Sequence, residues 1–332
     1  MDQYNAEKSD RGIIVLCLPP GRVSPQGVEK IRAGGEGREV FVSSEKKELE
    51  PLVDRIEIGF GDFPFSLISR MPRLQWVQLW SAGADWLQQY PELKGLPFKL
   101  TTTSGLHRQT ITEHVFGLLL SWDRQLPRAF AWQSRHEWRK VPMGELAVLE
   151  GKTMLILGYG AIGAKTAQVA LAFGMTVIGV RRKGPPVPRE ENGVRVVSST
   201  KLREQIPAAD VVVNILPLTG ETANSFGAAE FAAMKKTALY INIGRGATTD
   251  QGALLEALKS KAIAGALLDV TDPEPLPEDS PLWDMDNVLL TGHYGGFHPN
   301  YDDIALNIAL DNLGRYVRKE PLLNLVDKSA GY

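Results

Sequence analysis

Three side chains suited to acid–base chemistry follow apolar runs in the second half of the chain: Arg245, Glu274 and His293. Imidazole titrates nearest to neutral pH and can give or take the proton of an alcohol oxygen. A carboxylate on the other ring nitrogen favours the protonated ring, and a guanidinium fork can clamp a carboxylate and polarise a carbonyl. Each residue alone is more typical of a surface loop, but their shared placement after successive apolar runs favours a catalytic group acting on a 2-oxo acid.

A glycine-rich turn indicates where a dinucleotide binds. The residues Gly158, Tyr159, Gly160, Ala161, Ile162 and Gly163 form a GxGxxG pattern between an apolar run and a helical pattern. Gly158 permits a tight turn, Gly160 lets the backbone approach a pyrophosphate, and Gly163 allows close helix–strand packing. The helix N-terminus adds amide donors. We therefore expect the whole turn to bind a cofactor.

The next apolar run indicates which dinucleotide is bound. It ends in Arg181-Arg182-Lys183, at the place where NAD sites usually have Asp or Glu to hold the ribose 2′-hydroxyl. A cationic side chain suits a 2′-phosphate instead. The sequence therefore predicts NADP, bound by Arg181 and Arg182. The alternative is NAD, with the cations forming only a solvated strand edge.

The order of apolar runs predicts an α/β fold with two lobes. From Thr153 onward, continuous apolar runs alternate with helical segments, a pattern typical of a parallel, doubly wound Rossmann sheet covered on both faces. Residues 13–102 contain a smaller α/β set without a glycine-rich turn, which indicates a substrate lobe. Thr110-Ile-Thr-Glu113 resembles a capping box that starts a helix, and a helix at 301–317 returns the chain to the first lobe. The predicted domains are 1–105 plus 298–332, for substrate, and 106–297, for NADP, with a cleft between them.

Composition excludes several classes of protein. With 37 basic and 39 acidic residues among 332, the chain lacks the charge imbalance of a nucleic-acid or membrane-surface binder. The single Cys17 lies in an apolar run, so no disulfide framework is expected. The polar start and the absence of a long apolar run favour a cytoplasmic protein. The other histidines, among them His114, lack metal-ligand spacing, and no metal is expected.

The chain resembles the D-2-hydroxyacid dehydrogenase family over nearly its whole length, and is similar to its NADP-type glyoxylate/hydroxypyruvate reductases. The motifs that carry the resemblance are the segments 151–163, 216–219 with Thr222, 241–246 with Asp250, 265–270 with 274–276, and His293. Two positions depart from the family pattern: Gly292 replaces the common Pro, and Tyr294 is bulkier than usual.

The resemblance implies roles for further residues. It makes Arg245, Glu274 and His293 the catalytic trio and brings Asp269 near the nicotinamide end of the cofactor. Backbone amides near Ala82 and Gly83 would hold the substrate carboxylate together with Arg245. The remaining implied cofactor contacts are Leu216, Pro217, Thr222, Ile243, Gly244 and Gly295.

The resemblance also implies an architecture and an activity. The smaller lobe would be flavodoxin-like, and the protein would be a homodimer that pairs through its nucleotide-binding domains. The expected activity is reversible NADP(H)-dependent reduction of a 2-oxo acid to a D-2-hydroxy acid. Two alternatives stay open: a non-catalytic NAD(P)-sensing protein similar to co-repressors, and an NAD-linked phosphoglycerate-type dehydrogenase.

Overall fold

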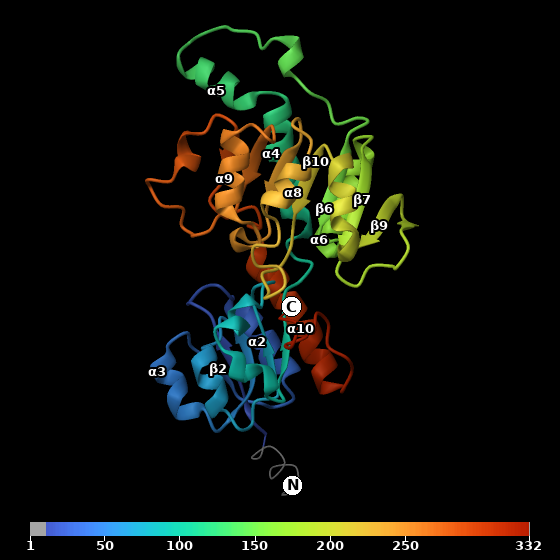
Figure 1. The fold of residues 1–332 in the computed structure, drawn as a ribbon. Helices are drawn as coiled ribbons and strands as arrows, with labels where there is room; N and C mark the ends of the chain where they lie inside the picture. Colours follow the sequence, from blue (N-terminus) through green and yellow to red (C-terminus); the bar gives the residue numbers. More distant parts are fainter. Residues whose placement is uncertain (1–10, 332) are drawn as a thin grey trace, which may run out of the picture. The chain divides into compact units, whose positions relative to one another are not determined.

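The computed structural model describes residues 11–331, apart from the side chains of Asp85 and Gln88. The chain divides into two compact units (Figure 1). Unit 1 comprises Met1–Leu106 together with His298–Tyr332, and unit 2 comprises His107–Phe297. The ranges predicted from the sequence, 1–105 plus 298–332 and 106–297, differ from these by one residue at one boundary.

Unit 1 is built on a five-stranded parallel sheet. Its strands are β1 (Ile13–Cys17), β2 (Val40–Val42), β3 (Ile56–Gly61), β4 (Trp76–Gln78) and β5 (Lys99–Thr101), and its α-helices are α2 (Pro25–Gly34), α3 (Lys46–Leu49) and α10 (Tyr301–Val317). The strand order is β2-β1-β3-β4-β5. This is the flavodoxin-like order, as predicted for the smaller lobe.

The sheet of unit 1 is buried on both faces. Successive β1 residues enter different apolar clusters: Ile13, Val15 and Cys17 lie in one, and Ile14 and Leu16 lie in the other. This follows from the two-residue period of a strand, which turns alternate side chains to opposite faces. Burial on both faces requires the continuous apolar run of β1, as is typical of a parallel sheet.

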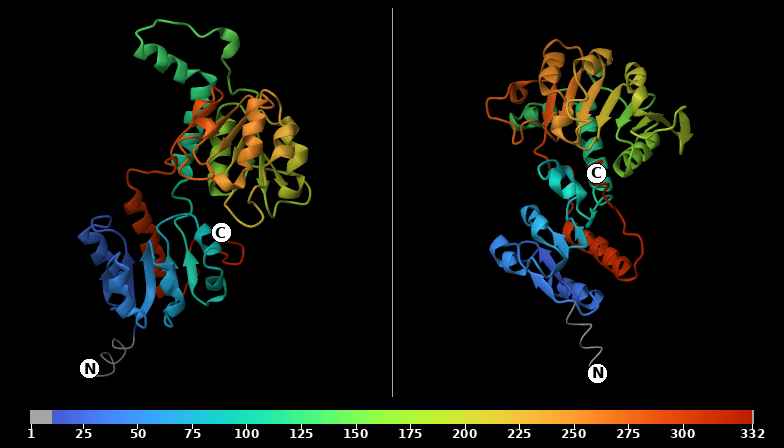
Figure 2. Two further views of the ribbon diagram at one scale, coloured as in Figure 1. Left: turned by 60° about the vertical axis from the view of Figure 1, so that its left-hand side comes forward. Right: turned by 60° about the horizontal axis from the view of Figure 1, so that its bottom comes forward.

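Helix α10 comes from the far end of the chain and covers one face of this sheet, as Figure 2 shows in red. Its residues Ala305, Ala309 and Leu313 repeat every four positions, so they form one apolar stripe, and all three are buried with Ile14 and Leu16. The helix predicted at 301–317 is confirmed at the same bounds.

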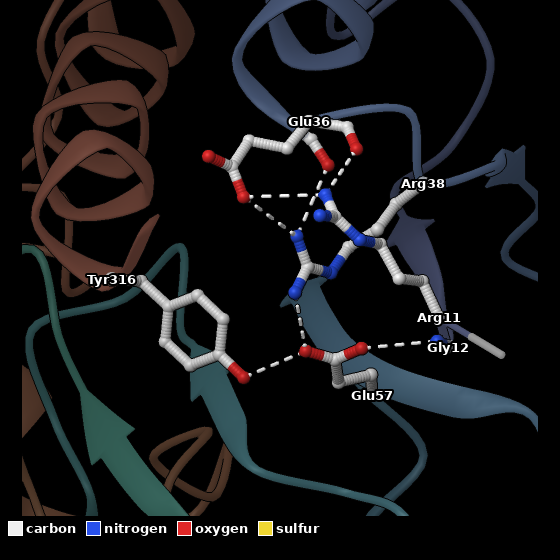
Figure 3. A network of polar contacts seen from close by, with 7 residues as sticks. Arg11, Gly12, Glu36, Arg38, Glu57 and Tyr316 are labelled. Atoms are coloured by element: carbon white, nitrogen blue, oxygen red, sulfur yellow. Dashed lines mark hydrogen bonds and ion pairs between the residues drawn. The ribbon is translucent and has the colours of Figure 1, made fainter. Parts of the chain in front are cut away.

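A set of polar contacts joins α10 to the amino-terminal end of strand β3 in the same sheet (Figure 3). We call Gly12, Arg38, Glu57 and Tyr316 the Glu57 network. The Glu57 carboxylate accepts hydrogen bonds from the Arg38 guanidinium at 2.8 Å, the Tyr316 hydroxyl at 2.8 Å and the Gly12 amide at 3.0 Å. Tyr316 lies on α10 and Glu57 on β3, so the network joins the last helix to the sheet.

Unit 2 is built on an eight-stranded sheet. Its strands are β6 (Thr153–Leu157), β7 (Thr176–Arg181), β8 (Arg189–Glu191), β9 (Val194–Ser198), β10 (Val211–Asn214), β11 (Leu239–Asn242), β12 (Gly265–Leu268) and β13 (Val288–Leu290). Its α-helices are α4 (Arg108–Asp123), α5 (Leu126–Ser134), α6 (Ala161–Ala172), α7 (Leu202–Gln205), α8 (Ala228–Ala233) and α9 (Gln251–Lys259).

The strand order in unit 2 is β13-β12-β11-β10-β6-β7-β9-β8. Leaving out β8, the order radiates from β6 to both sides, as in the Rossmann fold, and confirms the predicted doubly wound sheet. Met154 and Ile156 of β6 enter one core cluster, whereas Leu155 and Leu157 enter the other. The order reverses between β6 and β10, which is where such sheets bind ligands.

Two details of unit 2 differ from the sequence-based expectation. The capping box at Thr110 was wrong, because α4 begins earlier: His107 is the N-cap, and the Thr110 side chain already belongs to the first turn. Glu113 accepts instead from the Gln109 side-chain amide at 2.5 Å, one turn before it. The edge strand β8 was not predicted, and it pairs antiparallel with β9.

Helix α5 and the segment after it extend away from the sheet of unit 2 (Figure 1). This segment exposes several large apolar side chains, with Trp138 97% exposed. The exposed residues are Leu126, Phe130, Trp138, Met143 and Val148.

Candidate active site

The glycine-rich turn lies between the central strand β6 and helix α6. Gly158 has φ of +94°, and a Cβ there would lie 2.9 Å from the Ile215 carbonyl oxygen. A Cβ at Gly163 would lie 2.7 Å from the carbonyl oxygen of Gly158, so helix and strand pack too closely for a larger residue. A Cβ at Gly160 would meet nothing within 4 Å. The turn thus leaves space for a phosphate group beside the first amides of α6, which have no acceptor within the helix.

Strand β7 ends at Arg181, which packs over the aromatic side chain of that turn. The Arg181 guanidinium carbon lies 4.9 Å from the Tyr159 ring centroid, and its Nε donates to the Tyr159 carbonyl oxygen at 3.0 Å. The neighbouring Arg182 forms an ion pair with Glu221 at 3.5 Å. Arg181 therefore lies beside the glycine-rich turn, and Arg182 directly follows the end of β7.

Buried asparagines hold the loops that follow β10 and β11. The Asn214 side-chain oxygen accepts from the Leu216 amide at 3.0 Å, and its side-chain amide donates to Tyr240 and Thr248. The Asn242 oxygen accepts from the Gly244 amide at 3.1 Å. The sequence predicts a role for the two loops but not for these asparagines, although each of them ends an apolar strand.

Within the loop after β10, Thr222 closes a tight turn. Its hydroxyl donates to the Pro217 carbonyl oxygen at 2.6 Å, and the Thr219 amide donates back to the Thr222 hydroxyl oxygen at 2.8 Å. In this structure the Thr222 hydroxyl therefore shapes the predicted cofactor loop by bonding to backbone groups of that loop. Its predicted contact with a cofactor stays a prediction, as do those of Leu216, Pro217, Ile243 and Gly244.

Asp269, directly after β12, is 3% exposed and organises the loop that carries His293. Its carboxylate accepts from the Thr291 hydroxyl at 2.6 Å and the Gly295 amide at 3.0 Å, and the Nε2 atom of His114 lies at 3.2 Å. Burial alone would raise the pKa of Asp269, but hydrogen bonds from His114, Thr291 and Gly295 outweigh it and hold that pKa below its ordinary value.

This cluster also includes His114. The sequence predicts only a structural role for His114, because it lies on a helix and does not follow an apolar strand. The structure shows its ring beside both Thr291 and Asp269. Gly295 is equally constrained, because a Cβ there would lie 2.8 Å from the His114 ring. No single-residue pattern signals such a contact, since α4 and β12 are joined only by the fold.

His293 and Glu274 are in direct contact. The Nδ1 atom of His293 lies 2.5 Å from Glu274 Oε1, and the two side chains are 44% and 38% exposed. The His293 backbone amide donates to the Asp269 carbonyl oxygen at 2.8 Å, and its φ of +54° is the left-handed conformation that few side chains adopt. With Nδ1 directed to the carboxylate, Nε2 is the nitrogen that can exchange a proton with a ligand.

Arg245 lies directly beyond β11, at the same carboxyl edge of the sheet. Its side chain is half-buried, and one guanidinium nitrogen donates to the Gly244 carbonyl oxygen at 2.9 Å. Its backbone carbonyl accepts from Asn242 and from the Thr248 hydroxyl at 2.7 Å. Two hydrogen bonds therefore fix the backbone carbonyl of Arg245, and its side chain extends from a rigid backbone.

The predicted carboxylate loop, with Ala82 and Gly83, lies in unit 1 after β4. The Trp80 carbonyl oxygen just before it accepts from the Tyr301 hydroxyl at 2.6 Å and the Thr103 hydroxyl at 3.0 Å. The Trp80 ring nitrogen donates to Asp302 at 3.0 Å. The loop is thus anchored to the start of α10, and its role in holding a carboxylate stays a prediction.

Two features of the described part of the chain bear on the class of site. Among residues 11–331, no cluster of three or more His, Cys, Asp or Glu side chains is arranged to hold a metal ion. In the same range, no helix has the length and apolar character needed to cross a membrane.

The chain is similar in sequence and in fold to known dehydrogenases and reductases. Residues 116–295 match the family described as D-isomer specific 2-hydroxyacid dehydrogenase, NAD binding domain. The glyoxylate/hydroxypyruvate reductase B of Citrobacter koseri is 36% identical over 75% of this chain and 76% of that protein. The glyoxylate reductase of Aeropyrum pernix is 33% identical over 83% and 81%. Among solved structures, the NADPH-dependent glyoxylate/hydroxypyruvate reductase of Sinorhizobium meliloti, in complex with NADP and sulfate, is 30% identical with a TM-score of 0.80, over 97% of this chain and all of that one.

Proposed function

The chain belongs to the D-isomer specific 2-hydroxyacid dehydrogenase family, NAD(P)-dependent oxidoreductases of the CH–OH group, and we propose that it reduces a small 2-oxo acid to a D-2-hydroxy acid with NADPH. The observation that carries the proposal is the contact between His293 and Glu274 in the unit whose glycine-rich turn fits a dinucleotide. A hydrogen-bonded acid–base pair beside a dinucleotide site is what carbonyl reduction requires.

His293 supplies the proton. When bound, NADPH would supply the hydride for the substrate C2 atom. His293 Nε2 would supply the proton for the carbonyl oxygen. Glu274 holds Nδ1, fixes the ring orientation and stabilises the imidazolium before the proton leaves. In the reverse direction the neutral imidazole removes the hydroxyl proton.

Arg245 binds the substrate through its charge and planar fork. A guanidinium matches a carboxylate with two parallel hydrogen bonds and polarises a neighbouring carbonyl. Backbone amides of Ala82 and Gly83 would complete the carboxylate site. Because Asn242 and Thr248 fix its backbone, Arg245 loses little freedom when it binds.

NADP is the proposed cofactor, and two features support it over NAD. Strand β7 ends at Arg181 and Arg182 follows it, where an NAD site usually has an acidic residue. The Sinorhizobium reductase of similar fold was solved with NADP. The pyrophosphate would lie against the open face of Gly160 and the first amides of α6. Asp269 and Gly295 would lie toward the nicotinamide end.

Steady-state kinetics test the proposal directly. Glyoxylate, hydroxypyruvate and bulkier 2-oxo acids are each offered with NADPH and with NADH, and the chirality of the product is determined. A higher kcat/KM with NADPH than with NADH, together with a D-product, supports the proposal. Equal or better efficiency with NADH overturns the cofactor assignment. Tight dinucleotide binding without turnover of any 2-oxo acid overturns the enzyme assignment in favour of a nucleotide sensor.

We also propose that the protein is a homodimer that pairs through unit 2. The apolar side chains that α5 and the following segment expose, including Phe130, Trp138 and Met143, form a surface typical of a protein–protein contact. Light scattering after gel filtration tests this. A dimer that becomes a monomer in Phe130→Glu supports the proposal, and a wild-type monomer contradicts it.

A further inference from the structure

Arg181, the first of the two cations proposed to select NADP, has an acidic partner within the chain. Glu191 lies on the edge strand β8, ten residues after Arg181. Its two carboxylate oxygens lie 2.9 Å and 3.2 Å from the two terminal nitrogens of the Arg181 guanidinium. The remaining nitrogen, Nε, donates to the Tyr159 carbonyl oxygen. All three guanidinium nitrogens thus have acceptors within the protein.

The geometry of this contact is the one a phosphate would use. A guanidinium binds carboxylates and phosphates alike through two parallel hydrogen bonds. The Glu191 side chain, 20% exposed, is less exposed than that of Arg181, at 37%, so the carboxylate is held in place and the cation lies on the outer side. One face of the Arg181 guanidinium already lies against the Tyr159 ring.

A second cation keeps Glu191 in this position. Arg189, two residues earlier on β8, places Nη2 2.7 Å and Nε 2.8 Å from the same Glu191 oxygen. Hydrogen bonds from Arg189, and then the charge of Arg181, hold the pKa of Glu191 below its ordinary value, although desolvation opposes them. The carboxylate is therefore charged at neutral pH, and it keeps one cationic partner if Arg181 turns away.

We propose that Glu191 determines how strongly this enzyme prefers NADPH to NADH, by acting as an internal anion that competes with the cofactor's 2′-phosphate for Arg181. The proposal rests on the proposed function, because it assumes that the ribose lies at the end of β7. NADPH must draw Arg181 away from Glu191 or accept a like charge beside its phosphate. NADH carries no 2′-phosphate and meets neither obstacle. The preference for NADPH is therefore smaller than the two arginines alone would give.

The test compares Glu191→Gln with Glu190→Gln in the full-length protein. Glu190 is the neighbouring residue on β8, so its substitution changes the net charge equally without touching Arg181. Dissociation constants for NADPH and NADH are measured by fluorescence titration. We expect the NADPH dissociation constant of Glu191→Gln to fall by about three- to fivefold, the upper end of the range for one partly exposed charge interaction. The NADH constant, and both constants of Glu190→Gln, stay within about twofold of wild type.

Two further variants make the test specific. In the Arg181→Gln background, Glu191→Gln should improve NADPH binding much less, because the competition for Arg181 is gone and only the like charge beside the phosphate is removed. Glu191→Asp, which withdraws the carboxylate by one methylene, should fall between wild type and Glu191→Gln. If Glu191→Gln folds poorly, NADPH binding by Glu191→Asp still tests the competition.

The outcomes separate this proposal from the proposed function. If wild type binds neither dinucleotide, the proposed function fails. If wild type binds and turns over NADPH but Glu191→Gln equals Glu190→Gln, only the competition fails. Weaker NADPH binding in Glu191→Gln also overturns the proposal, because Glu191 would then hold Arg181 in place for the phosphate.

Discussion

The two units each place a glutamate beside a cationic or ionisable partner. The two pairs differ in how exposed their side chains are and in how many hydrogen bonds the glutamate accepts within the protein. Glu57 of unit 1 accepts from Arg38, Tyr316 and the Gly12 amide, and the Glu57 and Arg38 side chains are only 14% and 11% exposed. Glu274 of unit 2 contacts His293, and both of these side chains are more than a third exposed. The Glu57 network lies at the amino edge of its sheet, whereas the Glu274–His293 pair follows the carboxyl ends of strands.

This difference separates a structural cluster from a chemical one. A carboxylate whose hydrogen-bonding sites are used by the protein stabilises the fold, because removing a partner leaves buried polar atoms unsatisfied. An exposed pair stabilises little, but it keeps the second ring nitrogen of His293 for a substrate. Substitutions in the first cluster should therefore change stability, and substitutions in the second should change turnover.

The largest effect is expected for His293→Ala. Loss of the general acid should lower kcat by about 10² to 10⁴, the usual range for such catalysis. The free energy of unfolding and the dissociation constant for NADPH should hardly change, because His293 is exposed. Kinetics, a urea titration and a cofactor titration on one preparation provide the measurements. A kcat equal to wild type would remove His293 from the mechanism.

Glu57→Gln should have the next largest effect, and on stability only. The charge opposite Arg38 disappears, which should lower the free energy of unfolding by about 2 kcal/mol, within the range for hydrogen bonds to charged groups. Urea unfolding measures this, with Glu48→Gln in the exposed part of α3 as the control. The kcat of the folded fraction should equal that of wild type, and a reduced kcat would contradict the separation of roles.

Glu274→Gln should slow the reaction moderately and leave stability unchanged. The amide can still contact His293, but it no longer stabilises the imidazolium, so kcat for reduction should fall by about tenfold. The free energy of unfolding should equal that of wild type, because both side chains are more than a third exposed. A kcat equal to wild type would remove Glu274 from the mechanism.

The smallest effect is expected for Tyr316→Phe, which removes one hydrogen bond to Glu57 and should cost about 1 kcal/mol of stability.

Burial alone would raise the pKa of Glu57, but hydrogen bonds from Arg38 and Tyr316 outweigh it and set that pKa below the ordinary value of 4.5. The network therefore stabilises the fold above pH 4.5, and this contribution is lost as the pH falls further.

Urea unfolding at a series of pH values measures this dependence. The decline in stability below pH 4.5 should be shallower in Tyr316→Phe and in Glu57→Gln than in wild type. Parallel curves for all three proteins would contradict the role of Glu57.

The sequence predicted those features that depend on pattern. Continuous apolar runs indicated the parallel sheet of unit 2, and the family resemblance implied the flavodoxin-like sheet of unit 1. Placement after the apolar runs singled out His293 and Glu274, whose Nδ1 and Oε1 atoms lie 2.5 Å apart. Contacts between distant segments had no such pattern. The association of His114 with Asp269 joins α4 to the loop after β12, and that of Tyr316 with Glu57 joins the last helix to β3.

One missed feature did have a local signal. Asn192-Gly193, with φ of +52° and +78°, is a two-residue turn typical of a hairpin, and it joins β8 to β9. The strand was overlooked because its three residues, Arg189 to Glu191, are all charged and show no apolar alternation. Its consequence was large, because β8 carries the glutamate that faces Arg181.

The discontinuity of unit 1 has a consequence for how the protein is made. Helix α10 supplies part of the core of unit 1, yet it follows unit 2 in the chain. Domains that leave the ribosome as continuous segments can fold during synthesis. Unit 2 is such a segment, whereas the sheet of unit 1 emerges first and waits without the helix that covers it until residues 301–317 are translated. The apolar face that Ala305, Ala309 and Leu313 later cover therefore stays exposed on the nascent chain while unit 2 is translated.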